Sequence, residues 1–259
     1  MNIAAHASDP VANIEHIPFI TDGGIGEKAN LGLLVLQTDQ TIEDEFRFAL
    51  PEATALYGAR LKSPPDITPE TLREMEAEIA PTAALLPPVR LDVVGFGCTS
   101  GALVIGQEKV AARVRETLPG VRVTDPFTAG VAAMKALGVT RIGLLTPYIA
   151  SINSSLREAL MARGIDVPVM GSFNEADDDR VARITTASIE EAILAVGGSD
   201  ACEAVFVSCT SLRVARIVAR VEARLGKPVT SSNHALAWHM LRLSGQTQPL
   251  PGLGRLFTV

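Results

Sequence analysis

The sequence predicts an α/β protein made of two similar halves, each a doubly wound parallel sheet. Three observations predict this fold class. Short aliphatic runs recur along the chain, segments with helical periodicity lie between them, and a Cys-Thr-Ser tripeptide occurs twice. Strands that are buried on both faces of a parallel sheet have continuous aliphatic sequences, and strands that alternate with helices indicate crossover connections.

Eight aliphatic runs are the predicted strands. In chain order they are Leu31–Leu36, Ala55–Leu61, Leu91–Gly97, Val121–Thr124, Arg141–Thr146, Asp166–Met170, Ala204–Ser208 and Pro228–Ser231. Three segments have apolar residues at helical spacing, which predicts helices over Thr68–Leu86, Val181–Val196 and Leu212–Leu225. Thr68 and Pro69 suit the start of the first helix, and glycines follow the other two, as they commonly do at helix ends.

An internal repeat relates the two halves. The tripeptides Cys98–Ser100 and Cys209–Ser211 are 111 positions apart, and so are the strand sequences Gly32–Leu34 and Gly143–Leu145. In each half the tripeptide follows the third aliphatic run. Two coincidences at one spacing indicate two copies of one structural unit.

The repeat divides the chain into three parts. We expect an irregular N-terminal arm over residues 1–28, a first α/β half over 29–139 and a second over 140–259. Ligands of open α/β sheets bind beyond the carboxyl ends of the strands. If a pseudo-twofold axis relates the halves, the two Cys-Thr-Ser corners face each other, and an active site lies between them.

Composition excludes several classes of protein. The 259 residues have a formal net charge of −6 and no cluster of Lys and Arg, so we expect no nucleic-acid partner. No apolar run approaches the ~20 residues that a membrane helix needs, and no secretory signal is visible. The three cysteines do not form a disulfide framework. We therefore expect a cytoplasmic homo-oligomer that acts on a small molecule.

Cys98 and Cys209 are the candidate catalytic residues. Each follows a strand and precedes a predicted helix, where backbone N–H groups and the helix dipole stabilise a thiolate. Two thiols on opposite faces of one carbon suit racemisation, and they also suit cis–trans isomerisation by addition to a double bond. The alternative is that each cysteine is a small buried hydrophobic residue. Cys202 precedes its strand, has no counterpart in the first half and is interpreted as structural.

Other motifs indicate no cofactor. Gly23–Gly26 precedes a strand, whereas a dinucleotide-binding loop follows one. His234 and His239 are five positions apart in a predicted helix and so point to different faces, which excludes a metal pair. The acidic run Asp177–Asp179 is interpreted as a helix cap. We therefore expect catalysis without metal, nucleotide or pyridoxal phosphate.

Four motifs resemble the aspartate/glutamate racemase superfamily, in its branch of maleate isomerases and arylmalonate decarboxylases. The motifs are Gly97–Gly101, Leu145–Tyr148, Ser172–Glu175 and Ser231–Asn233, and they are most similar to the ectoine-utilisation proteins of that branch. The resemblance implies that Cys98 and Cys209 are catalytic. It implies substrate-binding roles for Thr99, Ser100, Tyr148, Asn174 and the backbone around Thr210. The decarboxylases of this branch have glycine at the position of Cys98, so the resemblance points away from decarboxylation.

The stretch after the first strand departs from the family pattern. Maleate isomerases have Pro-Ser-Ser-Asn there, and this chain has Leu36-Gln37-Thr38-Asp39. A carboxylate in the site would repel a dicarboxylate and attract an ammonium group, which favours an amino-acid-like substrate. The alternative interpretation is that Asp39 caps the helix that begins near Thr41. The sequence leaves both open.

The leading hypothesis is a two-cysteine racemase or isomerase of a small amino or carboxylic acid. The resemblance to ectoine-utilisation proteins implies a place in ectoine degradation. Three alternatives remain: a maleate cis–trans isomerase, an arylmalonate-type decarboxylase, and a non-catalytic protein that binds small acids in the same cleft.

Overall fold

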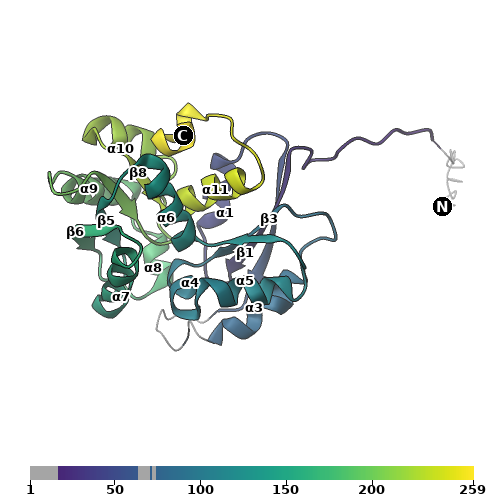
Figure 1. Ribbon diagram of the computed structural model, residues 1–259, viewed down its shortest axis with the longest axis horizontal. Coiled ribbons are helices and arrows are strands. Elements are labelled where there is room, and N and C mark those ends of the chain that lie inside the picture. Colours follow the sequence, from purple (N-terminus) through teal and green to yellow (C-terminus); the bar gives the residue numbers. More distant parts are fainter. Residues whose placement is uncertain (1–16, 64–70, 72–73) are drawn as a thin grey trace, which may run out of the picture.

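The computed structural model describes residues 17–63, 71 and 74–259. Most of the predicted N-terminal arm, residues 1–16, and the predicted helix start at Thr68 lie outside the described residues. Residues 17–28 contain neither helix nor strand and extend away from the body of the molecule (Figure 1). In the described part of the chain, no helix is both long enough and apolar enough to cross a membrane.

The described strands form two parallel sheets of four strands each. The first sheet has the order β2-β1-β3-β4, and the second has the equivalent order β6-β5-β7-β8. The strands are β1 (Ala29–Leu36), β2 (Thr54–Leu61), β3 (Val93–Gly97), β4 (Arg122–Thr124), β5 (Arg141–Thr146), β6 (Asp166–Ser172), β7 (Ala204–Val207) and β8 (Val229–Ser231). All eight predicted strands are confirmed, with bounds that differ by at most two residues.

The repeat is visible in the strand register. Leu33 of β1 pairs with Gly95 of β3, and Leu144 of β5 pairs with Phe206 of β7. Both members of the second pair lie 111 positions after their counterparts in the first. The two sheets are therefore copies of one pairing scheme, as the repeat predicts, and the predicted fold class is confirmed.

Helices cover both sheets. They are α1 (Ile42–Ala49), α3 (Glu76–Ala83), α4 (Thr99–Ile105), α5 (Gln107–Arg115), α6 (Pro126–Leu137), α7 (Ala150–Met161), α8 (Asp178–Ala182), α9 (Thr186–Gly197), α10 (Val218–Leu225) and α11 (Ser232–Leu243), followed by the 3₁₀ turns η1 (Pro251–Leu253) and η2 (Arg255–Thr258). All three predicted helices differ from these. Of the first, α3 covers Glu76–Ala83 and ends three residues before Leu86. The segment 181–196 is split, because Thr185 has an extended backbone and its hydroxyl accepts the N–H of Ser188 to start α9. The segment 212–225 is helical only from Val218.

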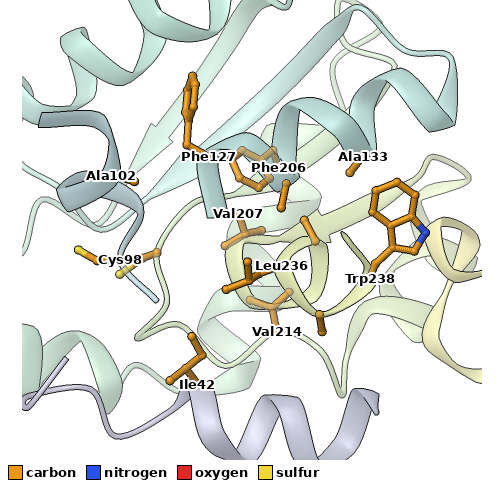
Figure 2. Close-up of a cluster of buried hydrophobic side chains, with 14 of the residues drawn as sticks. Ile42, Cys98, Ala102, Phe127, Ala133, Phe206, Val207, Val214, Leu236 and Trp238 are labelled. Atoms are coloured by element: carbon orange, nitrogen blue, oxygen red, sulfur yellow. The ribbon is translucent and has the colours of Figure 1, made fainter. Parts of the chain in front are cut away.

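Two helices lie between the halves and join them (Figure 1). α6 follows the first sheet but contacts β8 and η2, and α11 follows the second sheet but contacts α1, β3 and β4. Small residues permit this close packing: a Cβ on Gly95 would lie 2.7 Å from the Met240 sulfur, and one on Gly130 would lie 2.8 Å from the Phe206 ring. The two halves therefore share one hydrophobic core. In the part of it drawn in Figure 2, Cys98 lies at one side and Trp238 at the other.

Candidate active site

Each of four central strands places one candidate residue just beyond its carboxyl end. β3 is followed by Cys98, and β7 by Cys209 two positions after its last residue. β1 leads to Asp39 and β5 leads to Tyr148. All four side chains are at least 96% buried. The carboxyl ends of parallel strands are where α/β proteins bind ligands, so the fold gathers the predicted residues at that edge.

Cys98 is the N-cap of α4. Its sulfur accepts the backbone N–H of Gly101 at 3.1 Å, and the Ser100 hydroxyl lies 3.8 Å from the same sulfur. Gly101 must be small here, because a Cβ at that position would lie 2.8 Å from the sulfur. The predicted position of Cys98 between a strand and a helix is confirmed.

Cys209 does not precede a helix, and the prediction of a helix start at this cysteine was wrong. Its sulfur accepts the backbone N–H of Ser211 at 3.4 Å, and residues 210–217 form turns. The reason is a tertiary anchor. The Glu45 carboxylate on α1 accepts the N–H groups of Val214 and Ala215, which leaves them unable to join a helix.

Burial dominates the acid–base properties of both thiols. It raises the pKa of Cys98 to about 12, although the Gly101 N–H and the Ser100 hydroxyl lower it. Burial likewise raises the pKa of Cys209, with an added contribution from the Asp178 carboxyl. Desolvation therefore outweighs the stabilising N–H groups at both thiols.

The Tyr148 hydroxyl lies near both thiols. Burial raises the pKa of this phenol, and Cys209 and Cys98 raise it further. The hydroxyl is within hydrogen-bonding reach of the Cys209 sulfur and of the Thr99 side chain. The Tyr148 carbonyl is held by the Ser172 hydroxyl at 2.7 Å. Both cysteines therefore lie near one phenol.

Asp39 caps α1, which confirms the cap interpretation, and a role in substrate binding stays a prediction. Its Oδ1 accepts the N–H groups of Thr41 at 2.7 Å and Ile42 at 2.9 Å, so the side chain fixes the start of α1. Its Oδ2 is buried and has no hydrogen-bond partner among the described residues. Burial raises the pKa of this carboxyl, and the carboxyl in turn raises the pKa of both cysteines. One oxygen caps the helix while the charge acts on the thiols.

Three of the four remaining predicted residues belong to the same cluster. Thr99 is buried and its hydroxyl lies 2.8 Å from that of Ser232, the first residue of α11. Ser100 lies beside the Cys98 sulfur, and the Thr210 side chain lies near enough to the Asp39 carboxyl to lower its pKa. Asn174 is different. It is exposed, has a left-handed backbone with φ of 52°, and its side chain makes no hydrogen bond to another described residue. A binding role for Asn174 stays a prediction.

The sequence analysis missed three buried polar residues of this cluster. The run Asp177–Asp179 was predicted to cap a helix, and Asp177 confirms this, but Asp178 accepts the Ser211 hydroxyl at 2.6 Å instead. Asn233 donates its amide N–H to the Thr210 carbonyl at 2.7 Å. Glu45 anchors the loop after Cys209. Asp178 has acidic neighbours on both sides, so nothing in the sequence distinguishes it from them.

A groove of about 530 Å³ lies between α4 and α7. Ser100 lines it together with Leu103, Ile152 and Ala159, and Ser100 is the residue of the predicted site that the groove reaches. Because α4 belongs to the first half and α7 to the second, the groove lies at the boundary between the halves. In the described ranges, no three His, Cys, Asp or Glu side chains come together as metal ligands.

Comparison with known proteins agrees with this arrangement. The sequence model of the arylmalonate decarboxylase (Amdase) family matches residues 65–257, which is most of the chain. The chain belongs to the arylmalonate decarboxylase family. The predicted superfamily branch is therefore confirmed, whereas the similarity to ectoine-utilisation proteins stays a prediction.

Relatives within and near this family carry two activities. Arylmalonate decarboxylase of Bordetella bronchiseptica is 32% identical over 140 residues, which cover 53% of this chain and 58% of that enzyme. Maleate isomerase of Geobacillus stearothermophilus is 24% identical over 242 residues, which cover 88% of this chain and 96% of that enzyme. The crystal structure of a variant maleate isomerase of Pseudomonas putida S16 with maleate has a TM-score of 0.81, at 22% identity, and covers 89% of this chain and 97% of that one. The prediction of an enzyme is confirmed. The curated relatives that match along most of the chain are maleate isomerases, and a solved structure of a variant arylmalonate decarboxylase also covers 88% of the chain, at 28% identity and a TM-score of 0.74.

Proposed function

We propose that this arylmalonate decarboxylase family member is a cofactor-independent isomerase that uses Cys98 and Cys209 on a small amino or carboxylic acid. The observation that carries the proposal is the pair of buried thiols at equivalent strand ends, both beside the Tyr148 hydroxyl. A protein that only binds small acids needs the cleft but not two thiols near one point.

The two thiols have different roles in this proposal. Cys98, whose sulfur accepts the Gly101 N–H at 3.1 Å and lies beside the Ser100 hydroxyl, acts as the thiolate, and Cys209 acts as the S–H donor. In racemisation the Cys98 thiolate removes the α-proton, and the C–H electron pair moves into the carboxylate as an enolate. Cys209 then delivers its proton to the opposite face. In cis–trans isomerisation the Cys98 thiolate adds to one alkene carbon and the Cys209 S–H protonates the neighbouring carbon, so that the former double bond becomes a single C–C bond and rotates. Return of that proton to Cys209 re-forms the double bond and expels the Cys98 thiolate.

The carboxylate of the substrate needs hydrogen-bond donors at the edge of the cysteines. The hydroxyls of Thr99, Ser100 and Tyr148 and the backbone around Thr210 supply them in our proposal. Donors placed around the developing enolate lower the barrier of proton removal, because their orientation is fixed before the charge forms.

Decarboxylation is the second candidate, because it is the activity that gives the family its name. The presence of Cys98, where the decarboxylases have glycine, supports isomerisation over decarboxylation. A place in ectoine degradation belongs to the same proposal, so diaminobutyrates are included among the test substrates. A cytoplasmic location, in which thiols stay reduced, and a homo-oligomeric state are likewise proposed.

The test measures α-proton exchange in deuterated buffer and cis–trans conversion for a panel of small acids: aspartate, diaminobutyrates and maleate. We expect solvent deuterium to enter the α-carbon, or maleate to convert, and either Cys98→Ser or Cys209→Ser to abolish the reaction. Cys202→Ser is the matched control. Its thiol is also buried but contacts the carbonyls of Val196, Gly197 and Ser199 instead of the site. Activity that survives both cysteine changes contradicts the proposal, and release of CO₂ from an arylmalonate in place of isomerisation supports the second candidate.

A further inference from the structure

Two buried carboxyls from different halves lie near the thiols. Asp39 is 2% exposed and follows β1, and Asp178 is 6% exposed and begins α8. Asp178 raises the pKa of Asp39, and both carboxyls raise the pKa of Cys98 and of Cys209. The four groups therefore share one electrostatic environment.

No Lys or Arg side chain in the described ranges neutralises these two carboxyls. The charged groups that act most strongly on the two thiols are these carboxyls. Arg60 hydrogen-bonds to the Asp39 backbone carbonyl, but its guanidinium is already paired with Glu43 at the surface. Buried carboxylates are normally paired with a cation or fully hydrogen-bonded. Here no Lys or Arg of the described residues forms an ion pair with Asp39 or Asp178.

Two acceptor atoms in the same region lack donors. The Asp39 Oδ2 and the Asn233 Oδ1 are buried and have no hydrogen-bond partner among the described residues. The Asn233 amide binds the Thr210 carbonyl, and the Thr210 side chain lies against Asp39, so both acceptors lie around one residue. Buried acceptors without donors are uncommon in native proteins, and here they mark a place for a ligand that brings N–H groups.

We propose that Asp39 and Asp178 bind a positively charged nitrogen of the substrate, so that the two-thiol site takes amino acids in preference to dicarboxylates. This inference rests on the proposed function, because it concerns the same site. An ammonium group supplies three N–H donors and neutralises the carboxyls, whereas a second carboxylate brings neither. Its arrival also removes the charge that opposes ionisation of the thiols. An amino-acid substrate therefore promotes formation of the thiolate that attacks it, and the proton leaves to solvent.

The test compares two probes that differ by one ammonium group, aspartate and succinate. Their dissociation constants are measured by protection of the cysteines from iodoacetamide, which needs no turnover. We expect aspartate to bind at least about tenfold more tightly than succinate, and Asp178→Asn or Asp39→Asn each to lower that ratio by about tenfold. Without ligand, each change should raise the alkylation rate at pH 8 several-fold, because a negative neighbour of the thiols is removed. Asn retains the capping and hydroxyl-accepting oxygen in both variants.

Asp179→Asn is the matched control. Asp179 is adjacent in sequence, but its carboxylate pairs with Arg183 and Gln40 on the outer side, so we expect wild-type values. Equal or tighter binding of succinate by the wild type, or an unchanged ratio in both site variants, overturns the inference. The outcomes distinguish failure of this inference from failure of the proposed function. Preference for aspartate without proton exchange or isomerisation leaves this inference standing and contradicts the isomerase, and turnover of maleate with tighter binding of succinate does the reverse.

Discussion

Both carboxylate oxygens of Glu45 accept the backbone N–H of Ala215, at 3.0 and 2.9 Å. Glu45 lies on α1 of the first half, and Ala215 lies in the loop that follows Cys209 in the second half. One buried side chain therefore fixes the position of a catalytic loop across the boundary between the halves. The Thr41 hydroxyl makes a second link to this loop through the Ser211 carbonyl at 3.1 Å.

We predict that Glu45→Ala destabilises the protein and displaces the Cys209 loop. The change leaves the buried N–H groups of Val214 and Ala215 without acceptors, and an unsatisfied buried group costs about 1–3 kcal/mol. We expect the free energy of unfolding in urea to fall by about 2–4 kcal/mol, with a loss of activity at temperatures where the variant is still folded. Glu43→Ala is the control, because Glu43 pairs with Arg60 at the surface, and it should change stability by less than about 0.5 kcal/mol. Equal effects of the two changes would contradict the anchoring role.

The contribution of Glu45 to the free energy of unfolding should fall as the pH rises through the range in which this carboxyl ionises. Burial raises the pKa of the Glu45 carboxyl from 4.5 to about 7, against the lowering effect of the Ala215 and Val214 N–H groups. Between these values the folded state holds a proton that the unfolded state has lost, so the free energy of unfolding decreases with pH, by about 3 kcal/mol in total. Glu45→Gln should remove this slope, which is measured as the difference in urea stability between variant and wild type from pH 5 to pH 8. His234, whose pKa burial lowers to about 4, contributes the opposite slope to both proteins and cancels in the difference.

Tyr148→Phe should lower kcat/KM by about tenfold or more on the substrate that the screen identifies. The hydroxyl lies beside both thiols and the Thr99 side chain, and a hydrogen bond to a charged group is worth about 1.5–3 kcal/mol. The chain's other tyrosine is the control, since the Tyr57 hydroxyl contacts Asn30 on the far side of the first sheet at 3.3 Å. Tyr57→Phe should retain wild-type kinetics. Unchanged kinetics in Tyr148→Phe would remove this phenol from the site.

Gly130→Ala should destabilise the protein, although alanine is the better helix former by about 1 kcal/mol. Gly130 lies within α6, where the new Cβ would be 2.8 Å from the tip of the Phe206 ring and 3.2 Å from a second ring atom. The ring is buried in the shared core and cannot move away freely, and overpacking of this kind costs about 1–3 kcal/mol. Thermal or urea unfolding should show a net loss, and the double variant with Phe206→Leu should recover part of it. A gain in stability from Gly130→Ala alone would show that α6 has room to move.

Much of the fold was predictable from local sequence. The eight strands are continuous aliphatic runs, and the common offset of 111 residues predicted the equivalent registers of Leu33 with Gly95 and Leu144 with Phe206. Helix ends were less predictable. The turn at 210–217 has helical periodicity in its apolar residues, yet Glu45, which is distant in sequence, holds its N–H groups.

The candidate site, like the fold, was predictable from the sequence only in part. The strand-end cysteines were visible as a repeated tripeptide. A motif that recurs at equivalent positions in two copies of a fold indicates a functional role more strongly than a single cysteine does. Asp178 was not visible, because its neighbours Asp177 and Asp179 are the same residue type and only the packing of α8 turns one of the three inward.

The sequence by itself determined the fold class, the repeat and the identity of the two thiols, since strand burial and repeated motifs are properties of residues close together along the chain. Only the tertiary structure decided the environment of those thiols. Their protonation depends on burial and on the charges of Asp39 and Asp178, and both arise from the way the two halves come together. The two oxygens of Asp39 illustrate the difference: the cap on α1 is local and could be read from the sequence, and the unpartnered oxygen exists only because another half of the molecule closes over it.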